Sequence, residues 1–482
     1  MLQTLRKAWS VPEIRHKILV VLFILVLYRI GTVIPVPFVD AATFQGIFEA
    51  KYSTTVFSYM SALSGGAMEQ VTLFALGISP YITASIVLQL LTVAFPKLGE
   101  RAKQGEEGKE FINKWTRIVT VILAVVTAIG YYILLARDGA LVAGASYKDG
   151  GAWFFYAATI VVAFCAGASL VMWLAEKINE NGLGNGISLI LFFNIIASLP
   201  HTMKTLVSII IEVFSNEALT VWHGIGAIGF ALLVVAALLA MTFFVIFVTG
   251  SERRIPVQYA KRVVGRKMYG GQSTNLPLQL NMSGVMPVIF ASSIISLPAT
   301  IMVLCGVTGQ TTGMGDWFKW AFDPAVGTTR KFWNWVYWIF DTNGLIYPIV
   351  LFVLIIAFAY FYITISFNPV EVSNNLKKNG GMIPGIRQGR PTAEYIARIL
   401  SKVTLMGALF LSVVAIVPIL ANPLVIKPLL EVVQGGSAYS AQLASSFTFG
   451  GTSLLIVVGI ALETVRELEA QLTMRNYKGF LS

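Results

Sequence analysis

The chain consists mostly of apolar runs that are long enough to cross a lipid bilayer. A transmembrane helix needs about 20 mostly apolar residues. Ten runs of this kind occur, at residues 18–36, 71–95, 115–136, 153–173, 183–200, 224–248, 284–304, 345–366, 403–421 and 447–464. Hydrophobic residues make up 56% of the 482 residues and charged residues only 12%, whereas soluble domains carry about 25% charged residues. The sequence therefore predicts an all-α polytopic membrane protein with ten transmembrane helices.

Basic residues are unevenly distributed between the loops on the two sides of the membrane. If the N-terminus is cytoplasmic, the inside segments hold 26 Lys and Arg residues and the outside segments hold 8. An excess of Lys and Arg marks the cytoplasmic loops of membrane proteins. We therefore expect both termini in the cytoplasm. This distribution explains much of the net charge of +11 without a nucleic-acid partner.

Two stretches share the pattern G-x-x-P-x-I-x-A-S, at residues 77–85 and 284–292. They lie in the second and seventh apolar runs, where Gly and Pro are expected to weaken or break the helix. Because five spans is an odd number, a repeat of five must be inverted, and paired helix breaks in such repeats point to a central pathway. We expect an N-terminal half of residues 1–200 and a C-terminal half of residues 201–482.

A second pair of stretches fits the same scheme. The pattern G-x-S-L occurs at residues 186–189 in the fifth run and at residues 451–454 in the tenth. The fifth run opens with the glycine-rich stretch 182–186, and we expect Gly450 and Gly451 to open the tenth. Both repeats thus place similar residues at corresponding spans.

The sequence carries no recognisable catalytic or metal-binding motif. Its three histidines, His16, His201 and His223, lie far apart and near span ends. The glycine-rich stretch at 182–186 lacks the Lys-Ser/Thr ending of a phosphate-binding loop. Cys165 and Cys305 each lie alone in an apolar run, as small buried side chains do. We therefore expect no enzyme activity, no metal site and no cofactor.

Bulky aliphatic residues occupy related positions in the repeated spans. Ile82 and Ile86 share one helix face because they are four residues apart, and so do Ile187 and Leu191. A single aliphatic residue in a span usually packs against lipid or core, but here the repeats relate the members of a set. A ring of such side chains excludes water and ions by dewetting. It makes no specific bond to a passing polymer, so polymers of varied sequence can slide through it. The set predicts a polymer pore; its members are Ile82, Ile86, Ile187, Leu191, Ile289 and Ile456.

Three further segments have alternative interpretations. The small-residue stretch at 61–68 fits a short helix in a tight space and fits a flexible outer loop equally well. The inner segments 249–283 and 367–402 are large and basic. They are either ordinary topogenic loops that touch anionic lipid or a docking site for a large cytoplasmic partner. Such a partner could contain RNA. Their size favours docking.

Motifs in every part of the chain resemble the SecY family of the bacterial Sec protein translocase. The matching stretches lie at residues 74–82, 184–188, 259–262, 272–277, 281–287, 367–369, 375–378, 384–387 and 449–455. Together they are specific, although no single one is. Three positions depart from the familiar pattern: Leu191 replaces an isoleucine, Gln388 a common proline and Asn181 a common basic residue.

The resemblance implies a protein-conducting channel in the bacterial cytoplasmic membrane. The aliphatic set would form its pore ring, and the second and seventh spans its lateral gate. Residues 61–70 would form the plug, whose core is Ser61, Ala62, Leu63, Ser64, Gly65, Gly66, Ala67 and Met68. Docking of the SecA motor ATPase or the ribosome would use Arg253, Arg254, Lys261, Arg262, Arg387 and Arg390. SecE and SecG would be partner subunits, and the clients would be secretory and membrane proteins with signal sequences.

Two other functions are compatible with the residues alone. An ion-coupled secondary transporter often has a five-plus-five inverted repeat, but it usually keeps an ionisable residue or unwound polar backbone near mid-membrane. Here the charged residues that come near spans, Arg29, Lys402 and Glu463 among them, lie close to span ends. The third possibility is an assembly scaffold without a pore.

Overall fold

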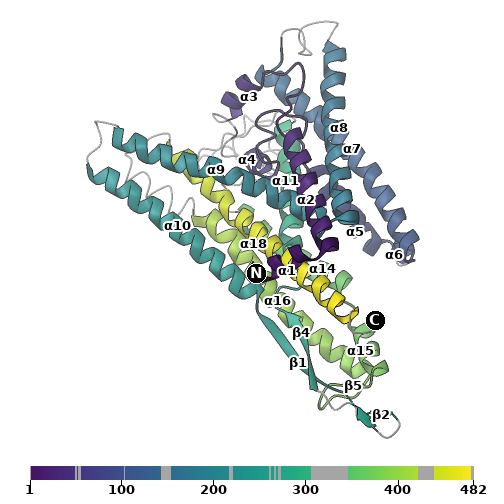
Figure 1. The fold of residues 1–482 in the computed structure, drawn as a ribbon. Helices are drawn as coiled ribbons and strands as arrows, with labels where there is room; N and C mark the ends of the chain where they lie inside the picture. The colour runs from purple at the N-terminus through teal and green to yellow at the C-terminus, as the bar shows by residue number, and fades with distance from the viewer. Residues whose placement is uncertain are drawn as a thin grey trace, which may run out of the picture.

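Long helices form the body of the molecule, and a small sheet projects from one end (Figure 1). The computed structural model describes residues 2–48, 52, 56–102, 104–142, 153–215, 221–259, 262–264, 267–269, 273–304, 346–421 and 439–478. Lys261 and Cys305 lie outside these ranges. The first helices are α1 (Leu2–Ser10), α2 (Pro12–Gly31), α3 (Ala41–Ile47), α4 (Val56–Leu63), α5 (Ser79–Ala94), α6 (Pro96–Ala102), α7 (Glu106–Asp138), α8 (Trp153–Asn181) and α9 (Gly186–Ser215). The later helices are α10 (Val221–Thr249), α11 (Met286–Leu304), α14 (Ile346–Ser366), α15 (Pro369–Lys378), α16 (Arg390–Ala421) and α18 (Tyr439–Lys478).

Each of the ten apolar runs overlaps one of the long helices. Within the described residues, four helices are long and apolar enough to cross a membrane, or five if α5 and α6, which meet at 111°, count as one span. Large apolar side chains cover the outside of the helices, such as Phe243 (73% exposed) and Leu239 (66%) on α10. Surface of this kind suits lipid rather than water. The polytopic helical fold is confirmed, and the number of ten spans stays a prediction.

The two G-x-x-P stretches begin helices instead of breaking them. Gly77 and Gly284 have positive φ angles, 56° and 62°, a conformation that glycine adopts without steric cost. In each case the helix starts two residues later, at Ser79 and Met286, and the proline lies in its first turn. Proline is favourable there because the first N–H groups of a helix have no partner within the helix. The backbone is thus alike at both copies, as an inverted repeat requires.

The G-x-S-L stretches do not occupy equivalent places. Gly186 is the first residue of α9, whereas Gly450 and Gly451 lie inside α18. The expectation that these two glycines open the tenth helix is therefore wrong. Glycine costs a helix interior only about 1 kcal/mol relative to alanine, so it does not determine where a helix starts.

Helices of the two predicted halves contact one another along two seams. Helix α5 packs on α7 and α8, while α11 packs on α14, α16 and α18. The first seam lies where α11 contacts α5 and α7, and the second lies where α9 contacts α18 and α10. Helices of both halves share one large apolar core.

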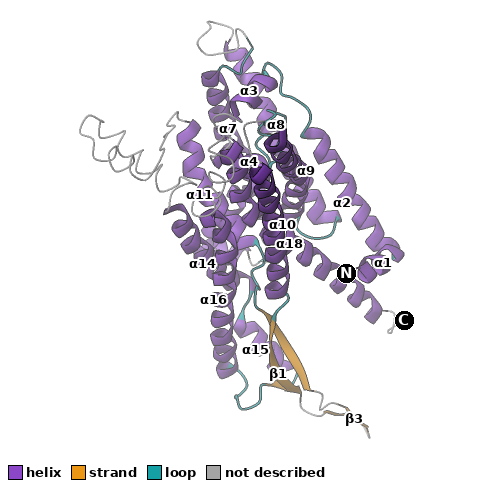
Figure 2. Ribbon diagram, turned by 90° about the vertical axis from the view of Figure 1, so that its left-hand side faces the viewer, coloured by secondary structure: helices purple, strands orange, loops and turns teal. Residues whose placement is uncertain are grey.

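The segments 249–283 and 367–402 fold together, which the sequence did not predict. Strand β1 (Glu252–Tyr259) pairs antiparallel with β4 (Ser273–Gln279), from Glu252↔Gln279 to Gln258↔Ser273. Its other edge pairs with β5 (Gly381–Met382), so the strand order is β4-β1-β5. A separate hairpin joins β2 (Arg262–Val264) and β3 (Lys267–Tyr269). Figure 2 shows the segments 249–283 and 367–402, which we call the sheet domain, at one end of the molecule with the strands beside α15 and α16.

The sheet domain has a small apolar core of its own. Ile255 and Val257 alternate with exposed neighbours along β1, as one buried sheet face requires. They cluster with Leu278, Ile383 and Ile396, which are also buried. The two predicted loops are therefore one structural unit.

At the other end of the molecule, α3 and Tyr52 pack against the end of α7. The Asp40 carboxylate accepts hydrogen bonds from the N–H groups of Ala42 and Thr43 and so caps α3. A further bond from the Thr43 hydroxyl contributes most to holding the pKa of Asp40 below its usual range. The Tyr52 hydroxyl donates to Asp138 at 2.6 Å, and burial together with this carboxylate raises the pKa of Tyr52.

The positive φ angles at the helix starts lead to a prediction about stability. Gly284→Ala should destabilise the protein by about 1–2 kcal/mol, because a Cβ is disfavoured in the left-handed region although no atom lies nearer than 3.8 Å to it. Gly229→Ala in α10 is the control, since its Cβ would meet nothing within 4 Å and its φ is not positive. Thermal unfolding in detergent measures both, and equal midpoints would contradict the prediction.

Candidate functional site

The six predicted ring residues all belong to the central apolar cluster. Five are almost completely buried, with exposed fractions of 1–3%, namely Ile82, Ile86, Leu191, Ile289 and Ile456. Ile187 is partly buried and packs against the same cluster. They come from four helices, α5, α9, α11 and α18. The helices contact one another pairwise, α5 with α11, α11 with α18 and α18 with α9. The structure thus brings aliphatic residues from both predicted halves into one core.

The serine hydroxyls that follow Ile289 on α11 donate hydrogen bonds to the backbone of their own helix. The hydroxyls of Ser292 and Ser293 donate to the carbonyl of Ile289 at 3.0 and 2.7 Å. The Ser188 hydroxyl is buried and has no hydrogen-bond partner within the described part of the chain. The centre of the molecule therefore presents aliphatic groups rather than a set of polar ligands.

The small-residue stretch 61–68 is packed into the molecule. It covers the end of α4 and the turns that follow, and α4 packs against α9 and α11. Its buried members are Ser61, Ser64, Ala67 and Met68, with exposed fractions of 1–5%. The Tyr131 hydroxyl of α7 donates to the Met68 carbonyl at 2.6 Å. These contacts favour the packed-helix interpretation over a flexible outer loop.

The irregular backbone after this stretch is paired and tightly enclosed. Leu73 donates its N–H to the Ile34 carbonyl at 2.9 Å, and Val36 donates to Val71 at 3.1 Å. A Cβ at Gly167 of α8 would lie only 1.9 Å from the Leu73 carbonyl oxygen. Glycine at that position therefore allows α8 to approach the non-helical segment closely.

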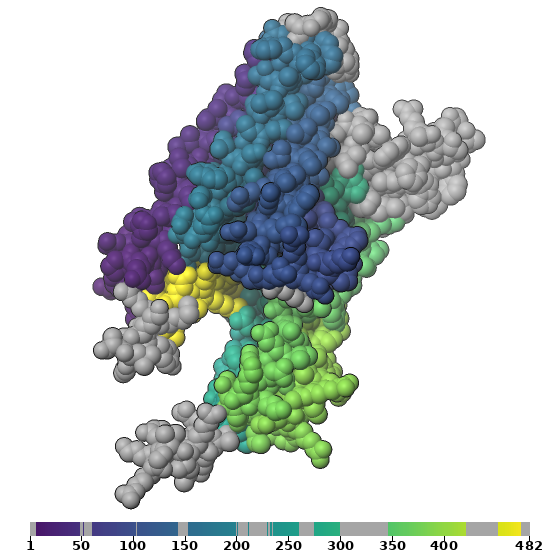
Figure 3. Space-filling model, turned by 90° about the vertical axis from the view of Figure 1, so that its right-hand side faces the viewer, coloured from purple at the N-terminus to yellow at the C-terminus, as the bar shows by residue number. Residues whose placement is uncertain are grey.

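The basic residues predicted for docking lie on and around the sheet domain. Arg253 and Arg254 are exposed at the start of β1, and Arg254 pairs with Glu252 at 2.6 Å. Arg387 is exposed between β5 and α16, and Arg390 pairs with Glu394 at 2.9 Å. The backbone of Arg262 lies in β2, while Lys261 is outside the described residues. In Figure 3 the sheet domain projects away from the helices and a recess separates it from the end of α18.

Sequence reasoning missed the side chain that ties the sheet domain to the helices. Arg466 of α18 donates to the Gln279 side chain at 2.8 Å and to the Thr249 carbonyl at 2.7 Å. Thr249 ends α10 and Gln279 ends β4, so one guanidinium holds the entrance and the exit of the first basic segment. The only feature of the sequence that pointed to this contact is an arginine shortly after the tenth apolar run.

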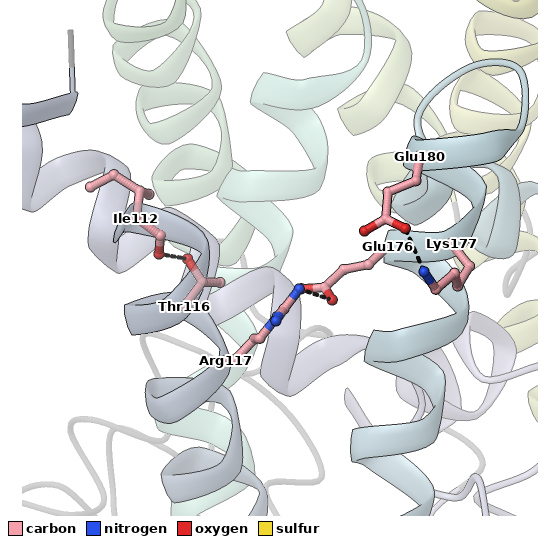
Figure 4. A network of polar contacts seen from close by, with 6 residues as sticks. All are labelled: Ile112, Thr116, Arg117, Glu176, Lys177 and Glu180. Atoms are coloured by element: carbon pink, nitrogen blue, oxygen red, sulfur yellow. Dashed lines mark hydrogen bonds and ion pairs between the residues drawn. The ribbon is translucent and has the colours of Figure 1, made fainter. Parts of the chain in front are cut away.

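A polar network also connects α7 to α8 (Figure 4). Arg117 of α7 forms an ion pair with Glu176 of α8 at 2.8 Å, and Lys177 pairs with Glu180 on the same helix. The Arg117 side chain is 52% exposed, and exposed pairs usually contribute at most about 1 kcal/mol. We assign this network to helix positioning.

The described part of the chain contains no cluster of three metal-ligating side chains. Cys165, on α8, is half-buried there.

Comparison with known proteins identifies the family. The SecY family model matches residues 72–465. A protein translocase subunit SecY of Streptomyces scabiei is 41% identical over 485 residues, and one of Mycobacterium bovis is 39% identical over 485; each alignment covers the whole of both chains. The chain belongs to the SecY family. This confirms the resemblance seen in the sequence motifs and favours the protein-conducting channel over the ion-coupled carrier.

Solved structures show that the fold is also that of the family. A protein-conducting channel matches with a TM-score of 0.56 at 16% identity, and 96% of each chain is covered. A SecY protein studied for its plug domain matches with a TM-score of 0.57 at 17% identity, again over 96% of each chain. The structure is therefore a membrane-embedded member of the SecY fold.

The contacts of Arg466 lead to a prediction about the sheet domain. Arg466→Met keeps the apolar stem but removes both hydrogen bonds, and bonds from a charged group contribute about 1.5–3 kcal/mol each. Amide hydrogen exchange in β4 should therefore become faster. Arg390→Met is the control because its ion pair is almost fully exposed. Equal exchange in the two variants would contradict the proposed role of Arg466.

Proposed function

We propose that the chain is the central subunit of a passive channel that passes unfolded secretory polypeptides across the membrane and releases membrane segments sideways into the lipid. The observation that carries this proposal is the apolar cluster in which α5, α9, α11 and α18 place six bulky aliphatic residues, in a chain of the SecY family. An apolar constriction offers no specific bond to a passing chain, so it suits many sequences.

The aliphatic set acts as the pore ring. Water and ions avoid a narrow apolar constriction because dewetting is favourable there. In the closed state the side chains fill the pore themselves, in agreement with exposed fractions of 1–3% for five of the six. A translocating polypeptide would take the place of these contacts.

The plug is the stretch 61–68, and its helix α4 packs against α9 and α11. A solved relative is described as a SecY protein whose plug domain stabilises the closed state and maintains a membrane seal. The lateral gate is the seam between α5 and α11, the two helices that begin with the same G-x-x-P geometry. Separation of these helices would connect the pore to lipid.

The sheet domain is the docking surface for the cytoplasmic partners. Both termini lie toward the same end of the molecule as the sheet domain (Figure 1), as an even number of spans requires. The excess of basic residues predicts that this end is cytoplasmic, in the cytoplasmic membrane of a bacterium. Anionic lipids lie near the same basic residues.

The energy for transport comes from the partners. We propose the SecA motor ATPase and the ribosome as driving partners and SecE and SecG as partner subunits of the channel. A Sec61 channel of canine origin, solved in a ribosome–channel complex, matches with a TM-score of 0.53 at 16% identity, which supports ribosome docking. Arg253, Arg254, Lys261, Arg262, Arg387 and Arg390 are proposed to contact these partners.

The ring assignment is tested by placing a polar side chain in it. Ile456→Asn, and likewise the Asn variants of Ile82 and Ile289, should wet the constriction, raise ion leak several-fold and relax the demand for a good signal sequence. Val353→Asn is the control, because this α14 side chain is 59% exposed on the outer surface. Unchanged leak and signal selectivity in all three ring variants would refute the ring.

The path of the client is tested by crosslinking. A stalled secretory polypeptide should crosslink to cysteines introduced at positions 82, 191, 289 and 456, and not to a cysteine at position 353. Saturable, ion-dependent uptake of a small solute by the chain alone would instead support a carrier.

The docking surface is tested by removing charge. Arg253→Gln, Arg254→Gln and Arg387→Gln together should weaken binding of the motor or the ribosome and reduce the salt dependence of binding, because exposed charges act mainly through screened long-range attraction. Arg137→Gln, at the opposite end of the molecule, is the control. Equal affinity of both variants in sedimentation assays would exclude these arginines.

A further inference from the structure

Two carbonyl groups at the end of the plug helix are held by side chains of other helices. Helix α4 ends at Leu63, and the last carbonyls of a helix have no partner within it. The Asn194 side-chain N–H₂ donates to the Leu63 carbonyl at 2.7 Å, and the Arg29 guanidinium donates to the Gly65 carbonyl at 3.1 Å. A positive charge is favourable at this end of a helix.

Asn194 connects three parts of the molecule through one amide group. It lies on α9 and is completely buried, and its N–H₂ also donates to the Tyr28 hydroxyl of α2 at 2.9 Å. Arg29 is the next residue on α2. Buried hydrogen bonds are strengthened by the low local dielectric, so α2 and α9 together grip the end of the plug.

The oxygen of the same amide destabilises the closed arrangement. Asn194 Oδ1 is buried and accepts no hydrogen bond from any described residue. A Cβ at Gly65 would lie 3.0 Å from this oxygen and 3.3 Å from an Arg29 nitrogen, so the backbone of the plug covers it. A buried acceptor without a partner is unfavourable, and departure of the plug would open it to water. The donated hydrogen bonds therefore favour the closed plug, whereas the unpartnered oxygen favours its release.

The position of Asn194 connects this grip to the ring. It lies three residues after Leu191 and seven after Ile187 on α9, and therefore close to the same helix face. A polypeptide that displaces the side chains of α9 at the ring would also displace the amide that holds Leu63.

We propose that Arg29 and Asn194 form a latch that holds the plug closed and that yields when α9 shifts at the ring. The proposal rests on the proposed plug function of residues 61–68. Arg29 and Asn194 are positioning residues, because they act on the channel through the backbone of Leu63 and Gly65.

The first test uses two adjacent glycines of the plug. Gly65 and Gly66 both have positive φ, 69° and 85°, but a Cβ at Gly66 would meet nothing within 4 Å. Both alanine variants strain a backbone position with positive φ, but only Gly65→Ala also pushes against both latch side chains. Potassium efflux from proteoliposomes containing the full-length chain and its co-purified subunits should be several-fold higher for Gly65→Ala than for Gly66→Ala. Equal efflux from the two variants would overturn the latch.

The second test removes the donors while keeping side-chain volume. Asn194→Leu and Arg29→Met should each raise resting efflux by about fivefold or more, the change in closed population expected when a net hydrogen bond is lost. The same variants should increase labelling of a cysteine at position 61 by an impermeant thiol reagent, in a background of Cys165→Ala and Cys305→Ala. A variant that merely weakened the fold would instead lower its thermal midpoint without selective labelling of this site.

A deletion separates failure of the latch from failure of the plug assignment. Removal of residues 61–68 should itself raise efflux, and Asn194→Leu should add nothing in that background because both changes act on one element. If the deletion leaks while the point variants match the parent, the plug stands and the latch is wrong. If the deletion does not leak, the proposed plug function fails.

Discussion

The structure depends on the absence of water around the backbone. Within a bilayer each N–H and C=O group must find a partner in the protein, so the chain crosses the apolar layer as helices. The described non-helical stretch between α4 and α5 packs against α2, α7 and α8. Gly167 shows how closely α8 packs on this stretch, because a single methyl group there would collide with the Leu73 carbonyl.

The same constraint explains why the centre of the molecule combines two kinds of contact. The residues of the proposed ring are aliphatic, so they could separate and close again without losing specific bonds. The proposed plug receives hydrogen bonds at its carbonyls from Arg29, Asn194 and Tyr131. These three donors lie on α2, α9 and α7, which all begin in the predicted N-terminal half.

Much of this arrangement was predictable from local patterns. Hydropathy located the helices because each apolar run must be long enough to cross the bilayer. The repeated G-x-x-P stretches mark the starts of α5 and α11, although the pattern by itself predicts helix breaks. A left-handed glycine is favourable just before a helix, and proline is favourable within its first turn. The same two residues therefore mark the start of a helix. The G-x-S-L pair misled, because glycine alone does not start a helix inside the long α18.

By itself, the sequence determined the membrane class, the uneven distribution of basic residues and the aliphatic positions of the proposed ring, because hydropathy, charge and helical spacing are local properties. Only the tertiary structure decided that the two basic segments form one sheet domain, and that Arg466 anchors it. It also decided that Asn194 meets Leu63, 131 residues away in the chain. Such pairings depend on which helices lie side by side, and no local pattern in a single sequence encodes that.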